Sequence, residues 1–231
     1  MELSPHRLDG IVFDLDATLV NLGGFVDWKK AHAEIVENYL DHECDPSIVN
    51  ECSEKGLFNM LDEMHAILLK ERGFENTLTI QQSTYDILSH YEQKGADSCT
   101  LMDGCPDILE WLKEKEIPIG ICTSNSPDSA EIALKLQGIR DYFKVVVGRK
   151  VDTPMKPHPS QLRKCFKLIG VAPENGMMVG DSHKDIIAGK KLGAYTVGIP
   201  VQYTRLDLMK EAGVDRIIDN LWELKEIIES F

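Results

Sequence analysis

Leu8-Asp-Gly-Ile-Val-Phe-Asp14-Leu-Asp-Ala-Thr-Leu19 is the first strong pattern along the chain. Its short apolar run ends in a carboxylate at Asp14, which predicts a buried β-strand over residues 8–14. A second carboxylate, Asp16, follows two positions later. Open α/β sheets bind ligands beyond the carboxyl ends of their strands, so the residues after Phe13 are the first candidates for a functional site.

Strand and helix patterns alternate in the second half of the chain. Strands are predicted at 117–122, 145–148, 177–180, 195–198 and 216–218, and helices at 128–137, 159–169, 185–192, 206–212 and 221–228. This alternation predicts an α/β fold, a Rossmann-like doubly wound parallel sheet with helices on both faces. If the first strand lies between 117–122 and 177–180, the ends of these three strands converge on one point.

Residues 22–100 interrupt the alternation. Apolar residues recur there at helical spacing and no convincing strand pattern is present: Trp28, Ala31, Ile35 and Tyr39; Leu57, Met60, Leu61, Met64, Ile67 and Leu68; Ile80, Tyr85, Leu88 and Tyr91. We therefore expect an α/β core formed by residues 1–21 and 101–231, with a helical segment, 22–100, inserted after the first strand.

The composition excludes several classes of partner. The 231 residues are 43% hydrophobic and 27% charged, as in an ordinary folded domain, and the formal net charge is −13. Nucleic acid and anionic membrane surfaces attract clusters of Lys and Arg, so neither is an expected partner. The N-terminus has no apolar signal segment and no run is long enough to span a membrane. Six cysteines without a Cys-x-x-Cys pair indicate reduced, mostly buried thiols, and the cytoplasm is the expected location.

The carboxylates of Asp14 and Asp16 can together perform phosphate chemistry. One carboxylate can attack phosphorus and form an acyl phosphate, which divides a difficult hydrolysis into two easier steps. The other can protonate the leaving alkoxide and later take a proton from water. An Asp-x-Asp pair alone is more often solvated surface in an acidic chain, and the preceding strand is what favours the catalytic reading.

Two further candidate pieces follow the strands at 117–122 and 145–148. Thr123 and Ser124 could hold phosphoryl oxygens with their hydroxyl and backbone N–H groups, although Ser, Thr and Asn also serve as ordinary helix caps. Lys156 lies between Met155 and Pro157-His-Pro159, and the two prolines could aim its ammonium group at the phosphate and at Asp14. Taken singly, a lysine in a loop is nearly always solvated.

Asp181 and Asp185 form the fourth piece, directly after the strand at 177–180. A carboxylate at a strand end and another at the following helix start suit Mg²⁺, which prefers oxygen ligands in octahedral array. The alternative is an acidic helix cap, which is common in any protein.

The four motifs occur in this order, and each follows a predicted strand. Together they resemble the haloacid dehalogenase-like hydrolase superfamily over the whole chain, and the layout is most similar to its phosphoglycolate phosphatase-like branch. The resemblance implies that 22–100 is a helical cap and that the protein is a Mg²⁺-dependent phosphatase of a small phosphorylated metabolite. It implies that Asp14 is the nucleophile and a metal ligand, and that Asp16 is the acid/base group and a metal ligand through its backbone carbonyl. It implies that Thr123, Ser124 and Lys156 bind the phosphoryl group. It also implies that Asp181 and Asp185 form the metal site, Asp185 through water or by holding Lys156.

The sequence departs from the family pattern at three places. Ala17 stands where the family usually has Gly, Gly23-Gly24 is an unusual pair that could form the hinge of the cap, and Asp152 to Met155 is not the commonest form before the lysine. Phe25, Trp28 and Lys29 are candidates, from position alone, for residues that contact the substrate.

Three other functions are compatible with parts of this pattern. The dehalogenases, phosphonate hydrolases and transport ATPases of this superfamily lack an acid at the position that Asp16 occupies here. Asp16 therefore favours a phosphatase or a phosphomutase, and no mutase signature is present in 22–100. A signalling receiver module would place its acidic pair on the first strand and its acceptor later in a smaller domain. A catalytically silent phosphate-binding protein is disfavoured because every catalytic position is filled. The natural substrate and the oligomeric state are left open.

Overall fold

The computed structural model describes residues 7–201 and 203–231, and it contains one parallel sheet. The strands are β1 (Gly10–Phe13), β2 (Ile119–Cys122), β3 (Val145–Val147), β4 (Gly176–Gly180), β5 (Tyr195–Gly198) and β6 (Arg216–Ile217). Their order is β3-β2-β1-β4-β5-β6, and every neighbouring pair is parallel. This is the order of a doubly wound α/β fold, which confirms the predicted fold class.

Strand β1 occupies the centre of the sheet, between β2 and β4, as the sequence predicts. The strand order reverses beside β1, because the chain proceeds outward to β2 and β3 on one side and to β4, β5 and β6 on the other. A crevice forms at such a point beyond the carboxyl ends of the strands. The loops that follow β1, β2 and β4 therefore meet at one place.

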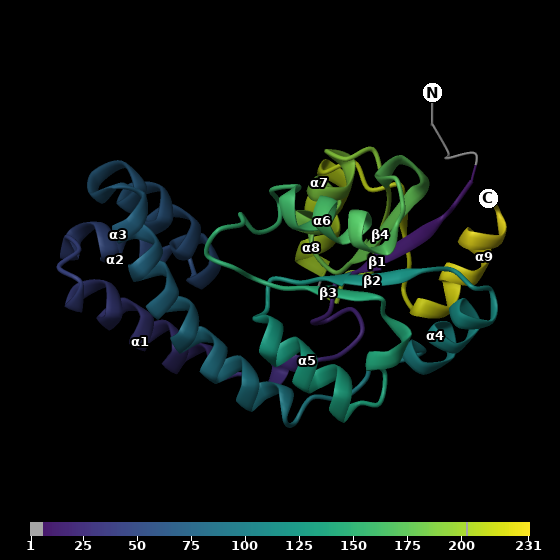
Figure 1. Ribbon diagram of the computed structural model, residues 1–231, viewed down its shortest axis with the longest axis horizontal. Helices are drawn as coiled ribbons and strands as arrows, with labels where there is room; N and C mark the ends of the chain where they lie inside the picture. The colour runs from purple at the N-terminus through teal and green to yellow at the C-terminus, as the bar shows by residue number, and fades with distance from the viewer. Residues whose placement is uncertain (1–6, 202) are drawn as a thin grey trace.

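Helices cover both faces of the sheet (Figure 1). On one face lie α6 (Ser160–Ile169), α7 (His183–Lys190) and α8 (Tyr203–Glu211), and on the other α4 (Cys105–Glu114), α5 (Pro127–Leu136) and α9 (Leu224–Glu229). Alternation along β1 explains this arrangement: Ile11 and Phe13 belong to one buried apolar cluster and Val12 to the other.

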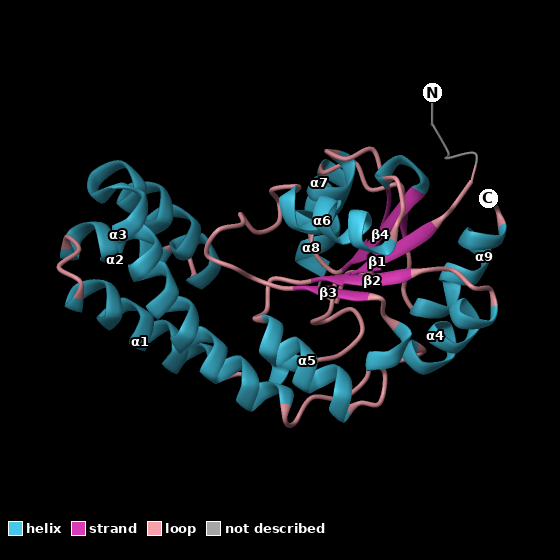
Figure 2. Cartoon of the chain, viewed as in Figure 1, coloured by secondary structure: helices cyan, strands magenta, loops and turns pink. Residues whose placement is uncertain are grey.

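Residues between the first two strands form helices α1 (Trp28–Asp41), α2 (Pro46–Glu54) and α3 (Leu57–Ala96), after a short 3-10 turn at Leu22–Phe25. Figure 2 shows α1, α2 and the first part of α3 to one side of the sheet, whereas the last part of α3 runs back to α5. The structure describes no strand within residues 22–100. Helix α3 is interrupted at Gly73, where the backbone has φ 75° and ψ 176°.

The predicted domain boundaries at 21/22 and 100/101 stay a prediction. One contact supports them: the two segments that connect the helices to the sheet lie side by side, with the Asn21 N–H donating to the Thr100 carbonyl at 3.0 Å and the Thr100 N–H donating to the Asn21 side chain at 2.8 Å.

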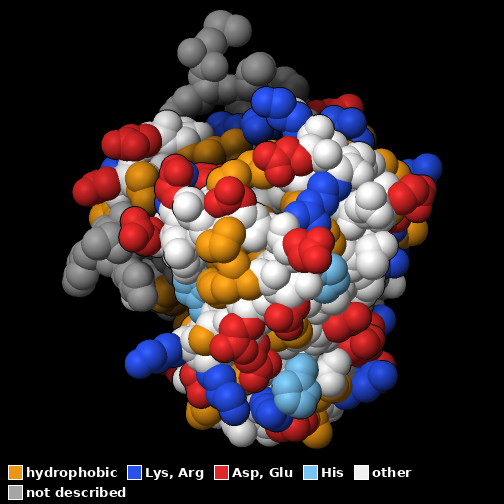
Figure 3. All heavy atoms as spheres, turned by 90° about the vertical axis from the view of Figure 1, so that its left-hand side faces the viewer, with side chains coloured by type: hydrophobic (Ala, Val, Ile, Leu, Met, Phe, Trp, Pro, Cys, Tyr) orange, Lys and Arg blue, Asp and Glu red, His pale blue; other side chains and the backbone are white. Residues whose placement is uncertain are grey.

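The charged side chains on the surface and the cysteines in the interior are placed as the composition of the chain predicts. Basic side chains are interspersed with acidic ones on the face formed by α1–α3 (Figure 3). All six cysteines are buried and free. None of the helices in the described ranges is long and apolar enough to cross a membrane.

Candidate active site

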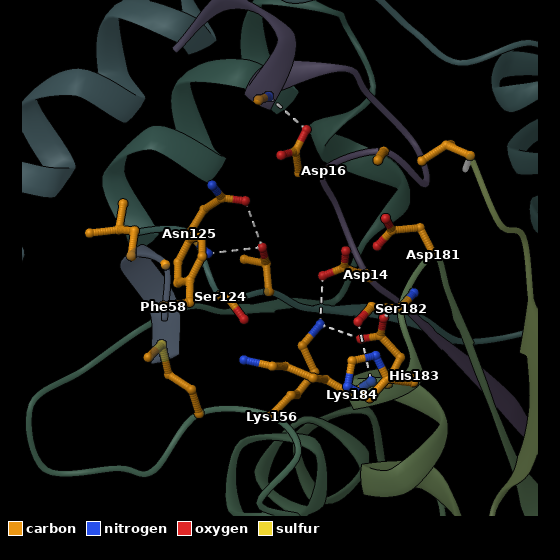
Figure 4. A pocket seen from close by; sticks show the side chains of 18 of the residues that line it. Asp14, Asp16, Phe58, Ser124, Asn125, Lys156, Asp181, Ser182, His183 and Lys184 are labelled. Carbon is orange, nitrogen blue, oxygen red and sulfur yellow. Dashed lines mark hydrogen bonds and ion pairs between the residues drawn. The ribbon is translucent and has the colours of Figure 1, made fainter. Parts of the chain in front are cut away.

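Asp14 lies directly beyond the carboxyl end of β1. Its backbone N–H donates to the Val179 carbonyl on β4 at 2.8 Å, so the main chain is still held by the sheet at this residue. Its side chain is buried, 7% exposed, and faces the pocket drawn in Figure 4. A carboxylate fixed in this way loses little conformational freedom when it reacts.

Lys156 links Asp14 to the first turn of α7, the helix that follows β4. Its ammonium group lies 2.6 Å from Asp14 Oδ1 and 2.6 Å from Asp185 Oδ1, and it donates to the Cys122 carbonyl at 2.8 Å. The lysine therefore joins the ends of β1, β2 and β4. Its 4% exposure and its three partners exclude a solvated loop lysine.

Burial and neighbouring charge act in opposite directions on the ionisation of these groups. Burial raises the pKa of Asp14 to about 6, although Lys156 lowers it, and Asp185 raises it further. Burial acts to lower the pKa of Lys156, but the adjacent Asp14 and Asp185 carboxylates outweigh that effect and hold it above its ordinary range. The lysine therefore keeps its positive charge at neutral pH.

Asp16 lies apart from the Lys156 cluster, on the opposite side of the pocket (Figure 4). Its Oδ1 accepts a hydrogen bond of 2.7 Å from the backbone N–H of Gly23. Burial raises the pKa of Asp16 to about 6, and the Gly23 N–H lowers it in part. A carboxyl group with such a pKa can both hold and release a proton near neutral pH, as an acid/base group must.

Asp14, Asp181 and Asp185 each offer a carboxylate oxygen, and these three oxygens lie within 4.8 Å of one another. Hard oxygen ligands in this number fit Mg²⁺, whose remaining positions are filled by water and substrate. Asp185 also accepts from the Ser182 N–H at 3.1 Å in a capping box at the start of α7. The metal-site and helix-cap readings of Asp185 are thus compatible. The Asp16 side chain does not belong to this cluster.

Thr123 and Ser124 begin the loop after β2 and line the pocket. The Thr123 hydroxyl donates to Asn125 Oδ1 at 2.9 Å and accepts from the Asn125 N–H at 3.1 Å, so its proton is held within the loop. Ser126 caps α5 through its side chain. The loop therefore combines helix capping with a surface of polar groups that faces Asp14.

The pocket has a volume of about 820 Å³ and is formed by the core and the helical insertion together. From the insertion come Trp28 and the segment Lys55 to Asn59, at the junction of α2 and α3. Of the three candidates named from position alone, Trp28 lines the pocket, but Phe25 and Lys29 are not among its lining residues within the described chain. Phe25 is instead exposed.

Sequence reasoning missed the contacts of three residues that support the site. Gly23 holds Asp16, and its pairing with Gly24 was the only available signal, which suggested a hinge rather than a close contact. Glu92 on α3 and Arg149 after β3 form a buried ion pair next to the Thr123 loop. Their positions in the sequence, 57 residues apart, carry no pattern that would bring them together.

Comparison with known proteins decides the family. The family model described as haloacid dehalogenase-like hydrolase matches residues 11–199. The chain belongs to this family. A Clostridium perfringens protein that carries the name PpaX is 32% identical over 224 residues, which are 96% of this chain and 98% of the relative. The pyrophosphatase PpaX of Bacillus cereus is 25% identical over 226 residues, covering 96% and 97% of the two chains.

A solved structure from Haemophilus somnus, described as a predicted phosphoglycolate phosphatase, matches with a TM-score of 0.61 at 21% identity and covers 95% of this chain and 97% of its own. A likeness at that identity shows the fold alone. The expected family, fold and hydrolase class are confirmed, and membership of the family contradicts the receiver-module alternative.

Proposed function

We propose that this hydrolase is a Mg²⁺-dependent phosphatase that forms a phospho-aspartate on Asp14. The observation that carries the proposal is the arrangement of Asp14 at the end of β1, with Lys156 on one side, Asp181 near it and Asp16 across the pocket. A carboxylate nucleophile, a charged phosphoryl ligand and a separate acid/base group are the parts that two-step phosphoryl transfer needs.

Each residue would have a distinct role. An Asp14 oxygen attacks phosphorus while Asp16 gives its proton to the leaving oxygen, and Asp16 then takes a proton from the water that hydrolyses the acyl phosphate. Lys156 and the loop at Thr123 and Ser124 hold the phosphoryl oxygens. Mg²⁺ on Asp14, Asp181 and the Asp16 carbonyl, with Asp185 in support, would neutralise the charge between carboxylate and phosphate.

Hydrolysis of p-nitrophenyl phosphate tests this proposal. We expect turnover with Mg²⁺, its loss on addition of EDTA, and activity at background level in Asp14→Asn. Asp16→Asn should lower kcat by about 10²–10⁴ while the protein remains folded, because only the proton transfers are lost. An Asp14→Asn protein as active as the wild type would exclude the phospho-aspartate mechanism.

The walls of the pocket favour an organic phosphate ester as the substrate. Trp28 and Phe58 of the insertion pack edge to face with ring centroids 5.8 Å apart, and Met155, Val201 and Leu208 add apolar surface. Inorganic pyrophosphate, the substrate implied by the names of relatives, has no apolar group for this part of the wall and would have to use Lys55, His183 or Lys184, which also line the pocket. An apolar leaving group would gain from burial against the apolar part.

A comparison of kcat/KM for p-nitrophenyl phosphate, an aliphatic phosphate ester and pyrophosphate separates these two substrate classes. We expect Phe58→Ala to lower kcat/KM for the aromatic ester by about 2-fold to 12-fold, since one aromatic contact contributes about 0.5–1.5 kcal/mol. Activity on pyrophosphate should change little. A preference of the wild type for pyrophosphate, unaffected by Phe58→Ala, would assign the protein to the pyrophosphatases instead.

A further inference from the structure

Glu92 and Arg149 form an ion pair behind the loop that follows β2. Two parallel contacts join them, Arg149 Nη1 to Glu92 Oε1 at 2.8 Å and Arg149 Nη2 to Glu92 Oε2 at 3.0 Å. The side chains are 1% and 0% exposed. Glu92 lies in the last part of α3, Arg149 follows β3, and the Tyr85 ring packs over the guanidinium group at 4.8 Å. Neither charged residue lines the active-site pocket.

Both members of the pair hold the main chain of the loop. Arg149 donates from Nη1 to the Ser124 carbonyl at 2.6 Å and from its backbone N–H to the Asn125 carbonyl at 2.8 Å. Glu92 accepts from the backbone N–H of Ser126 at 2.9 Å and from the Asn125 side chain at 3.4 Å. Every peptide unit from Ser124 to Ser126 is thus fixed by one of the two charges.

The same contacts determine the orientation of Thr123. The peptide group between Ser124 and Asn125 is planar, so its carbonyl and its N–H point in opposite directions. Arg149 holds the carbonyl, and the N–H donates to the Thr123 hydroxyl oxygen at 3.1 Å. A rotation of this peptide would release both contacts and move the polar groups that face Asp14.

Stability alone is a weak reason for such a pair. Two charges removed from water lose much solvation, and apolar residues of similar volume are often as stabilising as a buried ion pair. Fixed geometry is what the forked, bidentate guanidinium contact supplies in addition. We propose that Glu92 and Arg149 are positioning residues that hold the phosphate-binding loop in its productive geometry, an inference that rests on the proposed phosphatase function.

The test uses Arg149→Lys, which keeps the charge opposite Glu92 but cannot hold Glu92 and the Ser124 carbonyl with one planar fork. The measurements are kcat and KM for p-nitrophenyl phosphate, the inhibition constant of inorganic phosphate, and the thermal unfolding midpoint. We expect kcat to fall by about 10-fold to 100-fold and the phosphate inhibition constant to rise by about tenfold, in protein that is folded at the assay temperature.

Arg140→Lys is the matched control, because Arg140, beyond the C-terminal end of α5, also makes two contacts to one carboxylate, that of Glu131 on α5 at 2.9 and 2.8 Å. It should leave the kinetic constants unchanged. If Arg149→Lys does not fold, the double variant Glu92→Leu/Arg149→Met, which leaves no unpaired buried charge, takes its place with the same expected losses.

The inference is overturned if the variants have a lower unfolding midpoint but keep the kcat, KM and phosphate inhibition constant of the wild type. Glu92 and Arg149 would then have a purely structural role. Wild-type protein that turns over no phosphate ester with Mg²⁺ would contradict the proposed function itself, so the two failures are distinguishable.

Discussion

At the scale of single residues, the orientation of Asp16 depends on a glycine seven positions later. The Gly23 N–H holds Asp16 Oδ1 at 2.7 Å, and a Cβ atom on Gly23 would lie 2.4 Å from Asp16 Oδ2. The Gly23 carbonyl in turn accepts from the Trp28 indole N–H at 2.8 Å. The close approach of the main chain to the Asp16 carboxylate therefore explains why a glycine is needed at position 23, and the hinge stays a prediction.

Gly23→Ala should consequently impair catalysis while Gly24→Ala does not. The added methyl group of Gly23→Ala must displace the Asp16 carboxylate, whereas a Cβ on Gly24 would meet no atom within 4 Å. We expect kcat on p-nitrophenyl phosphate to fall by about 10²-fold in Gly23→Ala, because misplacement of a reacting group by about 1 Å has an effect of that order. Equal kcat in the two variants would show that Asp16 tolerates displacement.

Ala17 occupies the left-handed region of the backbone, with φ 59°. A Cβ atom in that region is disfavoured by roughly 1–2 kcal/mol, so Ala17→Gly should leave the free energy of unfolding unchanged or raise it by up to about 1 kcal/mol. Ala31→Gly, in the interior of α1, should lower it by about 1 kcal/mol. Denaturant unfolding measures both values, and a loss in Ala17→Gly as large as that in Ala31→Gly contradicts the argument.

At the scale of elements, the strands were predictable because a parallel sheet buries both faces of its strands. Residues 10–13 of β1 are all buried, and an uninterrupted apolar run between polar residues is visible in sequence. Helix α4 was not named in the sequence analysis, although Ile108, Leu109 and Leu112 are buried at helical spacing, because Gly104 and Pro106 precede them and are typical of a loop.

The candidate site was predictable only in part, for the same physical reason. Asp14 and Asp181 directly follow the neighbouring strands β1 and β4, so the topology of the sheet brings them together, and Lys156 and Asp185 follow β3 and β4 further along the chain. Glu92 contacts the loop after β2 from a helix, and it meets Arg149 through the packing of α3 against the core. An ion pair between residues so far apart in the chain produces no regular spacing that could be recognised in the sequence.

The interruption of α3 is a further feature that helical spacing could not reveal. Gly73, at φ 75° and ψ 176°, adopts a conformation that is essentially restricted to glycine. It follows Arg72, whose guanidinium group donates to the carbonyls of His42 and Glu43 in the turn between α1 and α2. The break thus redirects the helix so that its first part packs against α1 and α2.

Gly73→Ala should therefore destabilise the helical insertion. Alanine must either adopt the strained conformation or straighten α3, which would pull Arg72 from its two carbonyl partners. We expect the free energy of unfolding to fall by about 1–3 kcal/mol in denaturant unfolding. Gly24→Ala, at a position with open space and an ordinary φ, is the control and should behave as wild type. A stable Gly73→Ala protein would mean that the helix can run straight without loss.

At the scale of the whole molecule, the site concentrates negative charge inside an acidic protein. The chain has a formal net charge of −13, and Asp14, Asp181 and Asp185 are buried together beside the ammonium group of Lys156. An anionic substrate can approach such a site only where the local charge is compensated. A divalent cation bound by these carboxylates would therefore stabilise the folded protein, because it reduces the repulsion between them, and would also take part in the chemistry.

The pH dependence of stability follows from this arrangement. Burial raises the pKa values of Asp14 and Asp16 from 3.8 to about 6. Between those values the folded protein binds more protons than the unfolded chain, so without metal the free energy of unfolding contributed by the two groups falls as pH rises toward about 6 and is not regained above it. Mg²⁺ binds the deprotonated carboxylates, so its stabilising effect should grow over the same range.

Thermal unfolding in EDTA and in Mg²⁺, from about pH 5 to pH 7.5, measures both trends. Because other groups also titrate there, the decisive quantity is the difference between wild type and Asp14→Asn/Asp16→Asn. In EDTA the double variant should gain stability relative to wild type as pH rises, since its amides never ionise in the buried site. In Mg²⁺ the order should reverse, because the variant has lost a metal ligand. A difference in EDTA that stays constant with pH would mean that the two carboxyl groups ionise in the folded protein as readily as in the unfolded chain.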